Sequence, residues 1–453
     1  MQTGIDSNTL SSLFQTEGPS KTALVLAGGG LTGAVYEIGA LRAIDELLVD
    51  RSVTDFDIIV GTSAGALVGS MLAKGIPPGE MMQMLDGTHP EFSTILPSHV
   101  FSLNTGEFVR KSLRLPSTLK NALLHYLRHR SDMNVLDVVW SLIEALPSGL
   151  YNNHGLEVFL QKVFQERHLS DSFRDIQKSL YIVATDLDTG KRVIFGREPW
   201  DDVSLSRAVA ASSAVPLLYK PVFIDDQEFV DGAVRGNASL DVAIEAGAKL
   251  IVCVNPMVPV DNSDKQNIPL LGPDGRFLSE KGAQAVFSQF MRISLRSGLA
   301  YHIKQLRRQH PDVDIILIEP RRDDFQMAFY NTMRYSARVI IAQHGFESVT
   351  VDLAKQYPEL KATLARHGFN ITRRFVIEEL LAIQESNYDI DVVREMLERS
   401  ERRRRPMSFE DRYVTESLKD ALIGLEQVID HLEQDILPEG GDRTEEMVAE
   451  ALY

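Results

Sequence analysis

The chain has 453 residues, 44% hydrophobic and 24% charged, which is typical of a soluble globular protein with a sizeable core. Acidic residues outnumber basic ones by 63 to 47, and the resulting net charge of −16 argues against a nucleic-acid-binding protein. At about 150 residues per domain, the length fits two or three domains, or one large α/β domain with extensions.

The predicted elements begin with alternating strands and helices: a strand at 22–27, a helix at 33–48, a strand at 56–60 and a helix at 64–74. This alternation predicts an α/β fold, a mainly parallel sheet with helices on both faces. Further along, we predict mostly helix for 76–175, strands at 180–185, 192–195, 228–230, 249–254 and 314–318, helices at 203–211, 238–246 and 283–309, a loop at 261–282, and helices after 318.

These elements suggest a domain organisation in four parts. Residues 1–20 are polar and form a flexible N-terminal tail. A core domain covers 21–260 and includes a helical insertion at about 76–175. A C-terminal α/β extension, 261–405, packs on this core, and an acidic helical tail follows at 406–453.

Cysteine usage and targeting signals limit the class of protein further. The single cysteine, Cys253, excludes an internal disulfide framework and any multi-cysteine zinc site, and its apolar neighbours predict a buried side chain. No apolar run of about 18 residues predicts a transmembrane helix. The first 20 residues lack the basic start and the apolar core of a secretion signal, so we expect a cytoplasmic protein, at most peripheral at a membrane.

The first motif is the pentad Gly61-Thr62-Ser63-Ala64-Gly65, a G-x-S-x-G pattern between a predicted strand and a predicted helix. A nucleophilic serine on such a tight turn needs small neighbours, hence the glycines two residues to either side. The N–H of Ala64 and the start of the helix would face a developing oxyanion. The structural alternative is that Ser63 caps the helix while Gly61 and Gly65 serve packing.

The second motif is Gly28-Gly29-Gly30-Leu31-Thr32-Gly33, which follows the first predicted strand. Glycines let backbone N–H groups approach an anion closely. The pattern also matches G-x-G-x-x-G, but a dinucleotide site needs an acidic residue at the end of the second strand to hold the ribose. That strand ends in Val60-Gly61-Thr62-Ser63 without an acid, so the loop fits an oxyanion hole beside Ser63 better.

The third motif is Asp231-Gly232-Ala233, after a short predicted strand. Asp-Gly at a strand end can be a plain turn, whereas a carboxylate near Ser63 could accept its proton. In α/β-hydrolases a histidine completes the triad after the acid, so His302, His310 and His344 are formal candidates. None of the three lies in a motif that marks it as catalytic.

Together the three motifs resemble the patatin-like phospholipase family, in which a glycine-rich loop, G-x-S-x-G and D-G-[GA] occur in this order. Residues 207–216 also resemble the family's segment leading to its aspartate, and the resemblance covers roughly 22–255. It implies a three-layer α/β sandwich and hydrolysis of lipid acyl esters through an acyl-enzyme, with no metal and no cofactor.

The resemblance also implies roles for individual residues, with Ser63 as the nucleophile and Asp231 as its base. One departure is Thr32, since the family usually carries Arg or Lys there; this puts a preference for phosphate headgroups in doubt but leaves the backbone donors in place. The resemblance assigns the oxyanion hole to the N–H groups of Gly28, Gly29, Gly30, Leu31, Gly33 and Ala64, and names Gly61, Gly65 and Gly232 as motif glycines.

Charge is distributed unevenly over the accessory regions. Residues 96–130 hold six basic residues against one acid, interleaved with leucines, which fits either a packed helical subdomain or a lid that contacts an anionic bilayer. Residues 402–405 are four arginines, read as a solvated helix end or a lipid or partner contact. The tail 406–453 holds 13 acids against 3 bases and is a candidate surface for homo-oligomerisation or a protein partner.

The leading hypothesis is therefore a serine hydrolase acting on a lipid or membrane-surface substrate, with no nucleic-acid partner. A non-catalytic lipid-binding or regulatory protein with the same fold is the first alternative, and the presence of both Ser63 and Asp231 counts against it. An acyltransferase using the same two residues is the second alternative. A dinucleotide-dependent oxidoreductase is a distant third, because of the missing acid.

Overall fold

The computed structural model describes residues 20–49, 51–89, 94–113, 146–263, 277–322, 324, 335–372 and 382–398. The chain separates into a unit of residues 1–400 and a second unit of residues 401–453, and all described residues belong to the first. Several predicted features lie outside the described residues: the N-terminal tail, most of the basic part of 96–130, the centre of the loop 261–282, Arg402 to Arg405, and the acidic tail 406–453.

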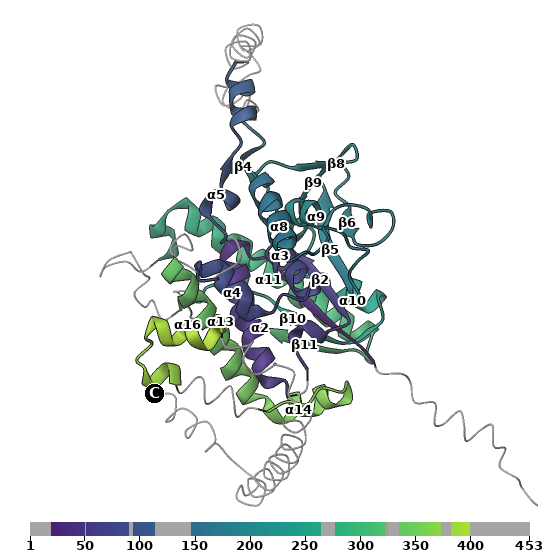
Figure 1. The fold of residues 1–453 in the computed structure, drawn as a ribbon, viewed down its shortest axis with the longest axis vertical. Coiled ribbons are helices and arrows are strands. Elements are labelled where there is room, and N and C mark those ends of the chain that lie inside the picture. The colour runs from purple at the N-terminus through teal and green to yellow at the C-terminus, as the bar shows by residue number, and fades with distance from the viewer. Residues whose placement is uncertain are drawn as a thin grey trace, which may run out of the picture. The chain divides into compact units, whose positions relative to one another are not determined.

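The core of the fold is an eight-stranded sheet (Figure 1). The first five strands along the sheet run parallel, and each of the last two is antiparallel to the strand before it, which confirms the mainly parallel sheet expected from the strand–helix alternation. In spatial order the strands are β11 (Asp314–Ile318), β10 (Ala248–Val254), β1 (Lys21–Leu26), β2 (Ile58–Thr62), β5 (Ser179–Asp186), β9 (Gln227–Asp231) and β8 (Val222–Ile224), with β6 (Arg192–Phe195) also paired to β5.

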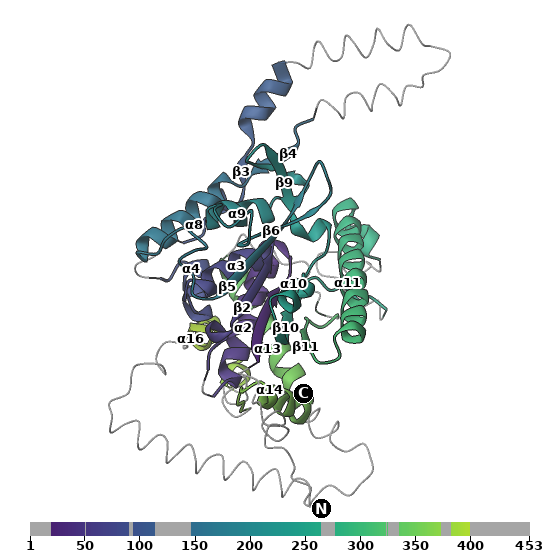
Figure 2. The same ribbon diagram turned by 90° about the vertical axis from the view of Figure 1, so that its right-hand side faces the viewer.

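Helices cover both faces of this sheet, because successive side chains of each buried strand point to opposite faces and both sets are apolar. On β1, Leu24 and Leu26 pack into one cluster, and Ala23 and Val25 into another. The first face carries α2 (Gly30–Leu47), α3 (Ala64–Ala73), α4 (Pro78–Asp86), α8 (His154–Glu166), α9 (Leu205–Ser212), α13 (Tyr335–Lys355), α14 (Tyr357–Arg366) and α16 (Ile390–Glu398). The second face carries α10 (Leu240–Glu245) and α11 (Ala283–Gln309) (Figure 2).

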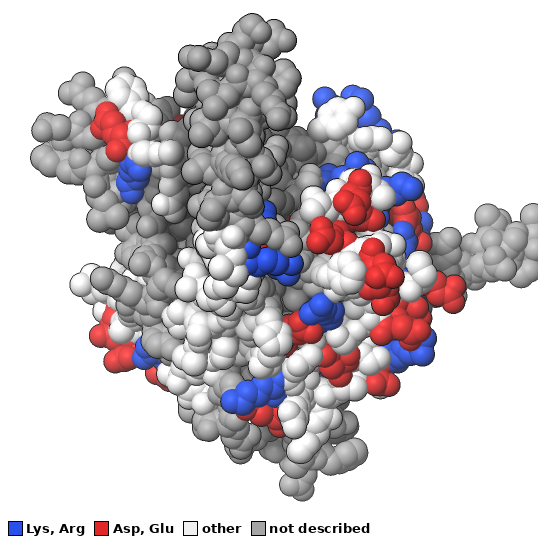
Figure 3. Space-filling view, turned by 90° about the horizontal axis from the view of Figure 1, so that it is seen from above, with Lys and Arg blue, Asp and Glu red and all other residues white. Residues whose placement is uncertain are grey.

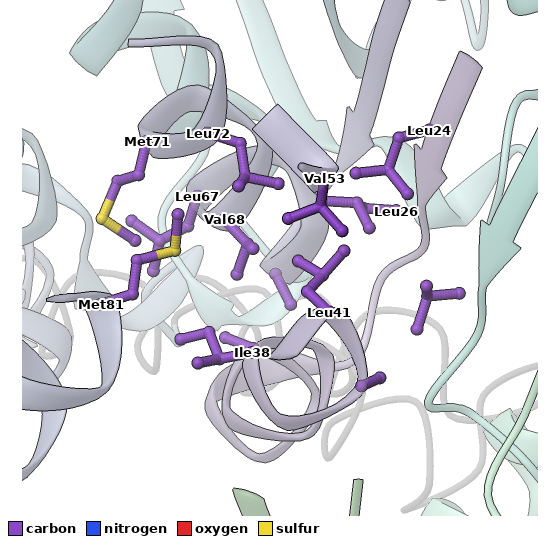
Figure 4. Close-up of a cluster of buried hydrophobic side chains, with 14 of the residues drawn as sticks. Leu24, Leu26, Ile38, Leu41, Val53, Leu67, Val68, Met71, Leu72 and Met81 are labelled. Carbon is purple, nitrogen blue, oxygen red and sulfur yellow. The ribbon is translucent and has the colours of Figure 1, made fainter. Parts of the chain in front are cut away.

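The first face has the thicker cover. Figure 4 shows Leu24 and Leu26 of β1 on one side of a dense cluster, with Ile38 and Leu41 of α2 and the apolar side chains of α3 facing them. Met81 of α4 closes the cluster from outside. The strands β1 and β2, which precede the glycine loop and Ser63, are thus packed along their length, a rigid support of the kind that functional sites require.

A close crossing fastens the C-terminal helix α13 to α2. A Cβ on Gly39 of α2 would lie 1.9 Å from the carbonyl oxygen of Ala342, and a Cβ on Gly345 of α13 would lie 2.4 Å from the carbonyl oxygen of Tyr36. Real Cβ atoms do not approach backbone that closely, so glycine at both positions sets the distance between the two helices.

The sequence predicts most elements but misses a small second sheet. The helix 283–309 and the strand 314–318 have the predicted bounds. Inside the region predicted to be mostly helical, β3 (Ser102–Leu103) and β4 (Gly149–Asn152) join β7 (Leu217–Tyr219) in a three-stranded sheet. Strands this short carry no recognisable period, and β4 pairs with a partner far along the chain. Within the described part, none of the helices is both long and apolar enough to cross a membrane.

Candidate active site

The serine and aspartate motifs meet because two strands end at adjacent positions along β5. The parallel strand β2 ends with Thr62 opposite Val183, and the antiparallel strand β9 ends with Asp231 opposite Ala184, the next residue of β5. Gly232 fills the narrow space between them, since a Cβ there would lie 2.3 Å from the carbonyl oxygen of Val183. The register of β5 therefore brings together two residues that are far apart in sequence.

Ser63 occupies a strained turn between β2 and α3. Its φ of 54° and ψ of −116° lie in a region that side-chain-bearing residues rarely adopt. The turn is possible because Gly61 and Gly65 lack side chains: a Cβ on Gly61 would lie 2.4 Å from the carbonyl oxygen of Gly65, and one on Gly65 would lie 2.2 Å from that of Leu26. This is the nucleophile-elbow geometry expected from the pentad.

A second serine, which no motif in the sequence marks, holds the Ser63 turn in place. The N–H of Ser63 donates to Oγ of Ser212 at 2.9 Å, and the Ser212 hydroxyl donates to the carbonyl oxygen of Val183 at 2.6 Å. Ser212 is fully buried at the end of α9. Its hydroxyl thus links the strained turn to β5, the strand that also positions Asp231.

The glycine loop lies directly beside Ser63. A Cβ on Gly28 would lie 3.4 Å from Cβ of Ser63 and 3.3 Å from Cβ of Ala233, so all three motifs converge at this point. On its other side, the loop packs against Pro256, whose ring would lie 2.6 Å from a Cβ on Gly29. The absence of side chains therefore sets how closely the loop backbone approaches the serine.

The structure narrows the set of backbone donors that could hold an oxyanion. The N–H of Gly28 already donates to the carbonyl oxygen of Asn237 at 3.1 Å, and that of Gly33 to the carbonyl oxygen of Gly29 at 3.0 Å. In the described part of the chain, the remaining predicted donors have no protein acceptor, and no side chain caps α2. These free N–H groups belong to Gly29, Gly30, Leu31 and Ala64.

Asp231 is a buried carboxylate, only 3% exposed. Burial raises its pKa from the ordinary value of 3.8 to about 6, although hydrogen bonds from the Ser63 hydroxyl and the Ala233 N–H oppose the rise. The Ala233 N–H lies 2.8 Å from Oδ1, and the Asp231 N–H donates to the carbonyl oxygen of Ala214 at 2.9 Å. Such a carboxylate is ionised at neutral pH and basic enough to share the serine proton.

The histidine candidates lie elsewhere. His302 faces Asp241 at 3.8 Å and His344 faces Asp324 at 3.2 Å. Within the described residues, neither of them nor His310 contacts Ser63 or Asp231, and no cluster of His, Cys, Asp and Glu suits a metal ion. The groups brought together around Ser63 are one carboxylate and several backbone donors.

This α/β fold, with a serine at a strand-to-helix elbow and an aspartate from a neighbouring strand, can be compared with known proteins. Residues 24–244 match the family model described as patatin-like phospholipase. These residues contain all three motifs. They are a patatin-like phospholipase domain, which confirms the resemblance drawn from the motifs.

Individual relatives are distant. A putative patatin-like phospholipase domain-containing protein of Caenorhabditis elegans is 25% identical over 248 residues, which is 54% of this chain and 17% of the relative. A probable lipid hydrolase of Invertebrate iridescent virus 6 is 21% identical over 228 residues, 49% of this chain and 63% of the relative. The crystal structure of VipD from Legionella pneumophila aligns with 74% of this chain and 67% of that chain, at 14% identity and a TM-score of 0.34. The match spans less than two thirds of either curated relative.

Proposed function

We propose that this protein is a serine acyl hydrolase that cleaves acyl esters of lipids, with Ser63 as the nucleophile and Asp231 as its base. The observation that carries the proposal is the hydrogen bond from the Ser63 hydroxyl, on a strained elbow, to a buried carboxylate with a pKa of about 6. The names of the matched family and of the viral relative, phospholipase and lipid hydrolase, support a lipid substrate.

In the first half-reaction, the Asp231 carboxylate accepts the proton of the Ser63 hydroxyl while Oγ attacks the acyl carbon. The carbonyl oxygen becomes an oxyanion, and the free N–H groups of Gly29, Gly30, Leu31 and Ala64 are the donors available to stabilise it. The start of α3 adds a partial positive charge at the same point. When the ester bond breaks, the leaving alkoxide takes the proton from Asp231, and the acyl group stays on Ser63.

In the second half-reaction, water replaces the alcohol. Asp231, again ionised, accepts a proton from the water molecule while the water oxygen attacks the acyl carbon. Ser63 Oγ then leaves the acyl carbon and recovers the proton from Asp231. The products are a free fatty acid and the original enzyme. A single carboxylate can serve both steps because its pKa of about 6 lies close to neutral pH.

Exposed apolar side chains follow Asp231 and its backbone partner Ala214 within three or four residues along the chain, and they suit an acyl chain. Val234, three residues after Asp231, is 55% exposed. Leu217 is 77% exposed and comes three residues after Ala214, whose carbonyl oxygen accepts the Asp231 N–H. Leu218 adds further exposed apolar surface next to it. Apolar side chains exposed beside a reactive site are a feature of enzymes whose substrate is itself apolar.

A fluorophosphonate probe tests the proposal, because it reacts only with an activated serine. We expect the wild-type chain to be labelled, and both Ser63→Ala and Asp231→Asn to lose labelling and the release of fatty acid from phospholipid. The matched control is Ser70→Ala, since Ser70 is a buried serine of α3, the helix that follows Ser63, and its hydroxyl donates to the Leu67 carbonyl oxygen. Labelling or turnover that survives in Ser63→Ala refutes the proposal, and acyl esters of an added alcohol in place of fatty acid would show transfer instead of hydrolysis.

A further inference from the structure

The helix α11 has apolar side chains on two opposite faces. One face packs into the second hydrophobic cluster through Leu299, Ile303 and Leu306, and Ala285 is buried as well. The opposite face is exposed to solvent by between 48% and 72% and contains Val286, Phe287, Phe290, Ile293 and Tyr301. A helix that only covers a sheet needs one apolar face, so the outer one requires another explanation.

The charge of α11 is also unlike that of the rest of the chain. Its 27 residues include five Lys or Arg and no Asp or Glu, within a protein of net charge −16. Lys304 and Arg308 are exposed and continue the outer face beyond Tyr301 at helical spacing. The end of the molecule seen in Figure 3, by contrast, carries both signs intermixed over its described surface. The outer face of α11 is thus apolar at one end and basic at the other.

The apolar end is hydrogen-bonded to the segment that follows the glycine loop's neighbour Pro256. The side chain of Gln289 forms two hydrogen bonds with the backbone of Val260, at 3.0 and 2.7 Å, and Arg292 donates to the carbonyl oxygen of Val258 at 3.1 Å. These residues follow Pro256, whose ring packs against the glycine loop. The first half of α11 therefore contacts the segment that follows β10 and that reaches the glycine loop through Pro256, and the helix forms an outer layer beside the sheet (Figure 2).

We infer that the outer face of α11 docks this protein on an anionic lipid surface. Phe287 and Phe290, whose rings are 6.3 Å apart, enter the interface between headgroups and acyl chains, and Lys304 and Arg308 contact anionic headgroups. The inference rests on the proposed function, because an enzyme that takes its substrate from a bilayer needs a surface that holds the active site against it. The absence of acidic residues along the whole helix favours this partner over an ordinary protein surface.

Vesicle binding of the full chain tests the inference in a Ser63→Ala background, so that binding is measured without turnover. We expect the starting protein to float with phosphatidylcholine vesicles that contain phosphatidylserine, and Phe287→Ser with Phe290→Ser to weaken that binding by at least about tenfold. Phe223→Ser is the matched control, since Phe223 is 54% exposed on β8, and should bind as the parent does. Lys304→Gln with Arg308→Gln should weaken binding to these vesicles by about tenfold and leave binding to pure phosphatidylcholine unchanged.

The outcomes separate this inference from the proposed function. If the double phenylalanine variant binds vesicles as well as its parent, the docking surface is wrong, whatever the wild-type enzyme hydrolyses. If these substitutions instead convert a dimer to a monomer in sedimentation velocity, with unchanged vesicle binding, the face joins two copies and the inference is overturned. Because the two rings are exposed, near-ultraviolet circular dichroism should confirm that the variant is folded. Failure of fluorophosphonate labelling refutes the proposed function alone.

Discussion

Replacing Asp231 by Asn should make the protein more stable at neutral pH while abolishing its activity. The folded-state pKa of Asp231 is about 6, against an ordinary value of 3.8. Between these values the folded protein holds a proton that the unfolded chain has lost, so the free energy of unfolding falls as pH rises. A difference of roughly two pKa units, at about 1.4 kcal/mol each, costs the wild type about 3 kcal/mol of stability at neutral pH.

The substitution removes this cost and keeps most contacts. Asn has the shape of Asp, and its side-chain oxygen can still accept from the Ala233 N–H, which lies 2.8 Å from Oδ1 in the wild type. Its amide can donate to Ser63 Oγ, but it cannot accept the serine proton. We therefore expect Asp231→Asn to exceed the wild type in unfolding free energy by about 3 kcal/mol at about pH 7.5 and by close to nothing at about pH 4.

Urea unfolding of both proteins across this pH range measures the difference. Asp188→Asn, in the exposed turn between β5 and β6, controls for the loss of one negative charge. A stability gain that is equal at both ends of the range would show that the substitution acts through packing rather than ionisation. A wild-type protein that is more stable than the variant at neutral pH would refute the argument that Asp231 is held in a desolvated site.

Three further predictions concern the same framework. The value of kcat/KM should fall about tenfold per pH unit below about pH 6, because protonated Asp231 cannot act as a base, and a flat profile down to about pH 5 would contradict this. Ser212→Ala removes the acceptor of the Ser63 N–H. Kinetic assays of the purified variant should therefore show kcat reduced by about 10- to 100-fold, and urea unfolding should show its free energy of unfolding reduced by about 1–3 kcal/mol. In urea unfolding, Gly39→Ala should lower the free energy of unfolding by more than about 2 kcal/mol, because its Cβ would clash with α13. Gly298→Ala, with open space around it on α11, should raise the free energy of unfolding by about 0.5–1 kcal/mol. Equal effects of the two substitutions would refute the close crossing of α2 and α13.

The fold could be predicted from the sequence where local pattern and environment agree. The helix 283–309 and the strand 314–318 were predicted with the right bounds because each carries a long or uniformly apolar pattern between clear stops. The pairing of β4 with β7 could not be predicted, because Gly149–Asn152 and Leu217–Tyr219 are too short to show a period. Their pairing is decided by packing around Gly149, where a Cβ would lie 2.2 Å from the carbonyl carbon of Tyr219.

The same division applies to the candidate site. Ser63 and Asp231 could be located because glycines mark the turns at two strand ends, and those glycines answer a local steric need. That the two side chains meet depends on the register of β5, which no local pattern records. Ser212 could not be singled out, because it is one of several small residues in α9 and acquires its role only through a hydrogen bond to a residue 149 positions away.

Three features meet at Ser63, and the first two oppose folding: a side-chain-bearing residue with φ of 54°, a carboxylate buried with a pKa of about 6, and backbone N–H groups without protein acceptors in the described structure. None of them improves packing, and a helix cap with an ordinary turn would avoid all three. Their convergence at the ends of β2 and β9, within a sheet that has apolar clusters on both faces, supports the proposed reactive site over a purely structural turn. The structural interpretation of the pentad explains the small residues but not the buried acid beside the serine, and a site built for acyl transfer to water explains both.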